Sequence, residues 1–210
     1  MIKKEEIIII VPGAKYIKSR AKFMQKLILY FYYLTRIYKP VYYNYSKKWE
    51  KKFDSPNRKV FWLHWGRGIS SISKFFAKRK LARLISHYKN KDISLVGVSL
   101  GGEIILELLP ELKNHEIKRI ILVCSTNENK NINFNSTEII NIFSEKDLFA
   151  KFAIEILSPF HGGQRLYGKN IKNVLIPEMT HDEFCSDSYI KKGIYKGKSV
   201  TSVINSFLIK

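Results

Sequence analysis

Residues 97–101 read Gly-Val-Ser-Leu-Gly, which is the spacing G-x-S-x-G. A serine on a sharp turn between a strand and a helix projects its hydroxyl above the sheet. That turn brings the positions two before and two after the serine into close contact, so glycine is favoured at both. The helix that follows directs its N-terminus at the site, where developing negative charge is stabilised. The spacing therefore predicts a nucleophile at Ser99, flanked by Gly97 and Gly101.

The flanking residues give this motif the context that it requires. An apolar strand is expected over Ile93–Val98, and an apolar helix over Gly102–Leu112, interrupted late by Pro110. The alternative is a tight glycine turn with an incidental serine. The strand–turn–helix order favours the nucleophile.

Apolar runs alternate with helical patterns along the rest of the chain. The β-branched run Ile7–Val11 suits a parallel strand that is covered on both faces. Strands are expected at Glu6–Val11, Val60–Leu63, Ile93–Val98, Ile117–Val123, Glu138–Phe143 and Val174–Ile176. Helices are expected at Ile17–Arg36, Ile69–Tyr88, Gly102–Leu112, Leu148–Leu157 and Lys198–Ile209. In the second helix the expected apolar face comprises Ile72, Phe75, Phe76, Leu81, Leu84 and Ile85.

This alternation predicts an α/β fold, a three-layer sandwich with a mainly parallel six-stranded sheet. No repeat and no linker divides the chain, so one domain is expected over residues 1–210. Residues 38–59 are polar, aromatic and basic without a clear period. They could form a cap or insertion over the site.

With these elements in this order, the chain resembles the α/β-hydrolase superfamily in its small lipase/esterase form, from Ile7 to Ile209. The resemblance implies the minimal α/β-hydrolase fold and a Ser-His-Asp triad in the chain order serine, acid, histidine. Relatives often carry a Gly-x-Gly-x-Ser turn after the second strand, and residues 66–70 of this chain are similar to it. His64, which precedes that turn, is expected to be structural.

The resemblance places the acid after the strand that lies two strands beyond the nucleophile. Asp147 fits that position best, with Glu145 as the second choice, and Asp147 could also cap the helix that follows it. The histidine is expected just after the last strand, where His181 lies. His161 is a rival, but it precedes that strand. In these roles His181 is the general base toward Ser99 and Asp147 orients it.

The resemblance also implies an oxyanion hole made of two backbone N–H groups. One belongs to Leu100, which follows the nucleophile, and the other to Ala14, in the loop after the first strand. Relatives often carry His-Gly in that loop, whereas this chain reads Pro12-Gly13-Ala14-Lys15. The departure leaves both backbone donors in place and changes the expected shape of the loop.

Charge is the unusual feature of the composition. There are 37 lysine and arginine residues against 18 acidic ones, a formal net charge of +19. Such a charge favours encounter with anionic partners. A genome rich in AT codons would produce much of the same bias without selection. Basic residues interleaved with aromatics over residues 30–53 suit contact with an anionic membrane surface. Nucleic acid is the less favoured partner.

The expected localisation rests on the absence of a membrane-spanning run and of a clear signal peptide in the sequence. The apolar run Leu27–Leu34 has eight residues, whereas a spanning helix needs about 20. Glu5 and Glu6 do not suit a signal peptide, and two cysteines are consistent with a reducing compartment. We therefore expect a cytoplasmic protein that could lie at the membrane periphery.

No cofactor and no metal site is expected. Residues 163–170 nearly spell a phosphate-binding loop but lack its final serine or threonine. No group of histidine, cysteine and glutamate has metal-ligand spacing in the sequence. Cys124 is expected to be a small buried apolar side chain.

The function implied by the resemblance is a serine hydrolase that cleaves a carboxylic ester or thioester, with that small acyl compound as its partner. Two alternatives stay open. One is a non-catalytic protein of the same fold, which the unusual loop at Pro12 motivates. The other is a basic protein that binds an anionic membrane or nucleic acid, which the net charge motivates.

Overall fold

The computed structural model describes residues 5–13, 45–65, 71–112, 117–125, 137–147 and 165–209. Six strands form one sheet in the order β2-β1-β3-β4-β5-β6, and every neighbouring pair is parallel. Their bounds are β1 Glu6–Val11, β2 Arg58–Trp62, β3 Asp92–Val98, β4 Ile117–Val123, β5 Glu138–Phe143 and β6 Ile171–Leu175. The predicted α/β class with a mainly parallel six-stranded sheet is confirmed.

Strand β1 is buried on both of its faces. Its run Ile7–Val11 is fully buried. Ile8 and Ile10 belong to one core cluster, whereas Ile7 and Ile9 belong to the other. Because β1 lies between β2 and β3 and is covered on both faces, no side of it meets solvent. This is why its sequence is continuously apolar rather than alternating.

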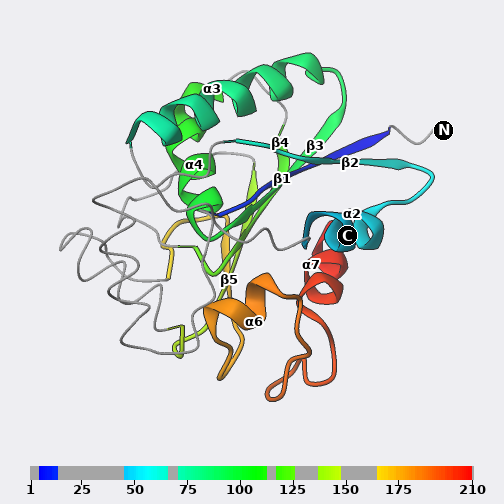
Figure 1. Cartoon of the computed structure of the whole chain (residues 1–210), viewed down its shortest axis with the longest axis vertical. Helices are drawn as coiled ribbons and strands as arrows, with labels where there is room; N and C mark the ends of the chain where they lie inside the picture. The colour runs from blue at the N-terminus through cyan, green and yellow to red at the C-terminus, as the bar shows by residue number, and fades with distance from the viewer. Residues whose placement is uncertain are drawn as a thin grey trace, which may run out of the picture.

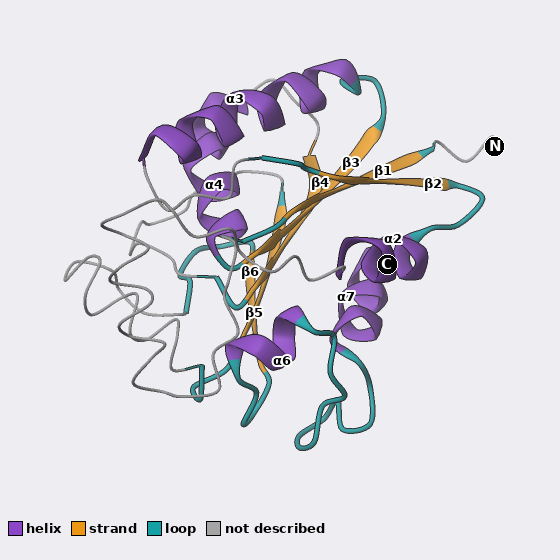
Figure 2. Ribbon diagram, viewed as in Figure 1, coloured by secondary structure: helices purple, strands orange, loops and turns teal. Residues whose placement is uncertain are grey.

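Helices cover both faces of the sheet and complete three layers (Figure 1). One face carries α3 (Ser71–His87) and α4 (Leu100–Leu108), and α4 continues as the 3-10 turn η1 (Leu109–Leu112). The other face carries α2 (Tyr45–Phe53), α6 (His181–Cys185) and α7 (Val200–Leu208). Figure 2 shows these helices on either side of the twisted strands. Because all six strands are parallel, the loops that follow them gather at one edge of the sheet.

The observed bounds of the strands and helices differ from the predicted bounds where the sequence is polar. Strand β6 begins at Ile171, three residues before the predicted Val174, because it is an edge strand whose Lys172 and Asn173 are exposed. Helix α6 has five residues and was not predicted. The helices expected over 17–36 and 148–157 lie outside the described residues.

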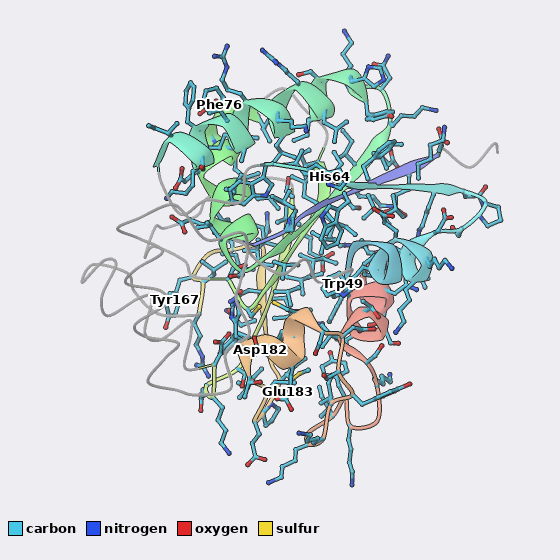
Figure 3. The ribbon with its side chains drawn as sticks, viewed as in Figure 1. Trp49, His64, Phe76, Tyr167, Asp182 and Glu183 are labelled. Carbon is cyan, nitrogen blue, oxygen red and sulfur yellow. The ribbon has the colours of Figure 1, made fainter. Side chains whose placement is uncertain are left out.

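Helix α3 buries a different face from the predicted one. Ala77, Leu81 and Ile85 are fully buried against the sheet. Ile72 and Phe76 are each 63% exposed, and Phe75 is also exposed. Figure 3 shows Phe76 pointing away from the sheet. The expected apolar face was wrong over its first half, because its residues fit a helical period that does not face the core.

Residues 45–53 of the expected cap, 38–59, form α2. Its Trp49 and Phe53 side chains are buried in the core cluster that also holds residues of α7 (Figure 3). Residues 38–44 lie outside the described residues, so a cap in that region stays a prediction. Among the described helices, none is long and apolar enough to cross a membrane.

A charged network joins the start of the sheet to the last helix. Glu6 on β1 is buried, accepting hydrogen bonds from Arg58 Nε at 2.7 Å and from Ser94 Oγ at 2.9 Å. The other arm of Arg58 donates to Asn205 Oδ1 and to the Leu208 carbonyl, both at 3.0 Å. Arg58 thus neutralises the Glu6 carboxylate and ties β1 and β2 to α7.

The substitution Arg58→Met is expected to lower the free energy of unfolding by about 3 kcal/mol, because it leaves the Glu6 carboxylate buried without its cation. The matched control is Lys59→Met on the same strand. Its ion pair with Glu5 is 3.2 Å long and exposed, so its loss is expected to cost much less than the loss of the Arg58 cation. Urea unfolding at neutral pH measures both. Equal losses would contradict the role given to Arg58.

Candidate active site

The turn between β3 and α4 holds Ser99 in a strained conformation. Its φ is 53° and its ψ is −127°. A non-glycine residue at positive φ costs about 1–3 kcal/mol, and such strain clusters at functional sites. Ser99 caps α4 without a hydrogen bond from its side chain to the helix. The hydroxyl is therefore not used for helix capping.

Three glycines allow the backbone to close around this turn. A Cβ at Gly97 would lie 2.6 Å from Gly102 Cα, and one at Gly101 would lie 1.9 Å from the Val11 carbonyl oxygen. Both contacts are with backbone, which cannot move aside. Gly97 and Gly101 are the glycines of the motif. Gly102, which sequence analysis did not single out, lets α4 approach Ser125 at the end of β4, where a Cβ would lie 2.0 Å from Ser125 Oγ.

The loop after β1 lies directly against the serine side chain. A Cβ at Gly13 would lie 2.7 Å from Ser99 Cβ and 3.2 Å from Ser99 Oγ. Glycine at position 13 therefore permits the approach of this loop to Ser99. Leu100, the first residue of α4, follows the serine. Ala14, the other expected oxyanion donor, lies outside the described residues.

Asp147 and His181 meet at the same edge of the sheet. Asp147 follows β5 and is fully buried, and His181 follows β6 and begins α6. His181 Nδ1 and Asp147 Oδ2 are 2.9 Å apart. Glu145, the second choice for the acid, is exposed. His161, the rival histidine, lies outside the described residues.

Hydrogen bonds hold in place the loop that carries Asp147 and the loop that leads to His181. Ser144 Oγ accepts hydrogen bonds from the backbone N–H of Lys146 at 3.2 Å and of Met179 at 3.1 Å. It thereby joins the loop of Asp147 to the loop that leads to His181. A capping box between Thr180 and Glu183 closes the first turn of α6. The sequence carried that signal as Thr-x-x-Glu, and it could have revealed α6.

Two cysteines complete the surroundings of His181. Cys124 Sγ, Cys185 Sγ and a ring nitrogen of His181 all lie within 4.8 Å of one another. Cys124 directly follows β4 with a φ of 44° and is fully buried. The backbone N–H of Ser99 donates to the carbonyl of Val123, the residue before Cys124, at 2.9 Å. The described contacts thus join Asp147 to His181 directly, and the backbone of Ser99 to the end of β4. Sequence analysis missed this cluster because its members are distant in the chain. The spacing of His181 and Cys185 on one helix was the available signal.

The ionisation of the cluster follows from its contacts. A hydrogen bond from Cys124 and the charge of His181 outweigh burial and lower the pKa of Cys185 to about 5. Burial lowers the pKa of His181, but the Cys185 thiolate and the Asp147 carboxylate together raise it to about 10. Burial and the Cys185 charge raise the pKa of Cys124 well above its ordinary value. These pKa shifts favour transfer of the Cys185 proton to His181, with Cys124 as the group that keeps its proton.

No protein-family model and no curated protein sequence matches the chain. Solved structures do match it. Est1E from Butyrivibrio proteoclasticus is 13% identical with a TM-score of 0.52, covering 99% of this chain and 88% of its own. The Francisella virulence factor BioJ is 11% identical with a TM-score of 0.55, covering 98% and 77%. RedJ is 10% identical with a TM-score of 0.56, covering 98% and 91%. The chain has the α/β-hydrolase fold.

Replacing Cys185 by alanine is expected to lower the pKa of His181, because the thiolate that favours the imidazolium is removed. The imidazole should titrate near pH 10 in the native protein and closer to its ordinary value of 6.5 in the variant. NMR titration of the histidine ring, assigned with His181→Gln, measures both midpoints. Ser188→Ala, near the same helix, is the control. An unchanged midpoint would show that Asp147 alone sets the pKa.

Proposed function

We propose that this protein is a serine hydrolase that cleaves a carboxylic ester or thioester through Ser99, His181 and Asp147. The observation that carries the proposal is the buried Asp147–His181 pair, 2.9 Å apart, at the sheet edge where Ser99 lies in its strained turn. A histidine held by a buried carboxylate, at the sheet edge that also carries the turn of Ser99, has the parts of a nucleophile, base and orienting acid. The α/β-hydrolase fold uses these parts in this chain order.

In the proposed reaction Ser99 Oγ attacks the carbonyl carbon and His181 takes the hydroxyl proton. Because Nδ1 is bonded to Asp147, the proton must move to Nε2. The tetrahedral intermediate places its negative oxygen near the N–H of Leu100, with the Ala14 N–H as the second proposed donor. His181 then gives the proton to the departing alcohol or thiol, leaving Ser99 acylated. Water, deprotonated by the same Nε2, releases the acid.

Cys185 sets a condition on this base. While His181 is an imidazolium paired with the Cys185 thiolate, it cannot accept the proton of Ser99. The reaction proceeds from the molecules in which that proton has returned to Cys185. The thiolate therefore lowers the fraction of competent enzyme at neutral pH without touching the substrate.

A fluorophosphonate probe tests the nucleophile. We expect labelling of the native protein and none of Ser99→Ala, with Ser206→Ala on α7 as a control that labels normally. Asp147→Asn should lower the hydrolysis rate of p-nitrophenyl acetate by on the order of 10⁴-fold, as the same change does in a serine-protease triad. Labelling that survives in Ser99→Ala would refute the proposal. A folded native protein that does not label would favour a non-catalytic role for the fold. Comparing the p-nitrophenyl ester with an acyl thioester then assigns the leaving group.

A second proposal concerns where the protein works. The exposed residues Ile72, Phe75, Phe76, Arg79 and Arg83 recur at the three- and four-residue spacings of one helical face of α3. The Arg79 guanidinium lies 5.5 Å from the centre of the Phe75 ring. Apolar side chains with cations on one face suit the surface of an anionic bilayer, and the net charge of +19 favours the encounter. Because α3 runs back from the carboxyl edge of the sheet, its apolar first half lies toward the edge that carries Ser99.

Vesicle sedimentation tests this contact. The double variant Phe75→Ser/Phe76→Ser should bind phosphatidylserine-containing vesicles about 10-fold more weakly or worse, since two apolar rings no longer leave water. Tyr167→Ser, an exposed aromatic elsewhere (Figure 3), should bind as the native protein does. Native binding should weaken with added salt. Equal binding of both variants, or of vesicles without anionic lipid, would contradict an anionic membrane as the partner.

A further inference from the structure

The side chains of Cys124, His181 and Cys185 have a chemistry that the hydrolytic scheme does not use. Two thiols and an imidazole lie within 4.8 Å of one another, and no other such group of three is present among the described residues. Thiolate and imidazole are the donors that zinc and other soft divalent cations prefer. Of the three, only His181 transfers a proton to or from the reacting groups in the proposed hydrolysis, so the presence of two thiols beside it needs a separate explanation.

The spacing of the three donor atoms is close to what zinc requires. With Zn–S near 2.3 Å and Zn–N near 2.0 Å, donors at the corners of a tetrahedron lie about 3.5–3.8 Å apart. The observed separations, all within 4.8 Å, need only a small closure. His181 and Cys185 are four residues apart on α6, so they share one face of the helix, as paired metal ligands on helices do. Cys185 is partly exposed, which gives an ion a way in.

Neighbouring residues already hold the donors in place. Histidine ligands of zinc usually donate their other ring N–H to a carboxylate, which fixes the tautomer and makes the ring more basic. Asp147 Oδ2 accepts this bond from His181 Nδ1 at 2.9 Å, which leaves Nε2 as the ligand atom. Cys124 is fixed by its backbone N–H, which donates to the Ile142 carbonyl at 2.8 Å. An ion at this place would have an orienting shell as well as ligands.

We propose that Cys124, His181 and Cys185 bind a zinc ion that switches the hydrolase off. The ion takes the lone pair of His181 Nε2, which is the pair that must accept the Ser99 proton. Zinc binds two thiolates and a neutral imidazole, so the thiol proton of Cys124 and the proton held between His181 and Cys185 leave to solvent, and no electron is transferred. Three protein ligands leave a fourth position for water. Zinc binding stands on the donor geometry alone, whereas inhibition rests on the proposed function.

Cobalt(II) reports binding without reference to activity. In the native protein, freed of metal by a chelator and kept reduced by a phosphine, one equivalent of cobalt(II) should give tetrahedral ligand-field bands and a thiolate charge-transfer band. Zinc should displace both. Cys124→Ala and Cys185→Ala should weaken binding by at least about 100-fold, Asp147→Asn by about 10- to 100-fold, and Ser186→Ala not at all. Zinc should also protect Cys185 of the native protein from alkylation by iodoacetamide, a readout that needs no variant.

Fluorophosphonate labelling reports the switch. Zinc should abolish labelling of the native protein, and a chelator should restore it. Labelling of Cys124→Ala should be insensitive to the same zinc concentration, each protein being compared with its own zinc-free rate. Absence of the charge-transfer band together with unprotected Cys185 would overturn the zinc site. Binding with undiminished or stimulated labelling would overturn the switch. If the metal-free native protein does not label, the proposed function fails, and the cobalt spectrum still decides the zinc site.

Discussion

Asp147 is a carboxylate with no exposure to solvent, and it is bonded to His181 at 2.9 Å. Removing such a group from water costs several kcal/mol unless a partner offsets the loss. The pairing therefore constrains both loops that it joins, which is why Ser144 ties them together and a capping box closes the first turn of α6. The position of the His181 ring is a consequence of satisfying Asp147.

The parallel sheet makes this pairing possible from distant parts of the chain. Ser99, Cys124, Asp147 and His181 follow β3, β4, β5 and β6, which are successive neighbours in the sheet. Each loop leaves its strand at the same edge, so residues separated by many positions come within a few ångströms. The close approach also needs small residues. Gly101 lies where any Cβ would strike the Val11 carbonyl, and Gly13 lies where one would strike Ser99.

The sequence predicted the parts of the fold that depend on burial of continuous apolar strands. The β-branched run of β1 and the apolar runs of β4 and β5 have the predicted bounds, because strands inside a parallel sheet have no solvent face. Edge strand β6 began too late in the prediction, since Lys172 is polar and exposed. In α3 the periodicity identified a helix but not its buried face, because its aromatic residues lie on the outside.

The candidate site, too, could be predicted from the sequence only in part. Ser99 was predicted from a sequence motif, and Asp147 and His181 were predicted from their positions after the strands. Both kinds of signal can be recognised in the sequence itself. The contact of Cys124 with His181 and Cys185 is tertiary and depends on the register of β4 beside β5. No spacing in the sequence records that register, so only the spacing of His181 and Cys185 was a local signal, and the approach of Cys124 could not be predicted.

The groups around the His181 ring compete for its Nε2 lone pair. It can hold the proton shared with Cys185. In the proposed hydrolysis it accepts a proton from Ser99, and in the proposed zinc site it binds the ion, so each use excludes the others. Asp147 favours each of these uses, because an oriented and more basic imidazole is a better base and a better ligand. The Asp147–His181 pair therefore does not by itself select an activity. Under both proposals the thiols beside it select the activity, since they decide how often the lone pair is available to Ser99.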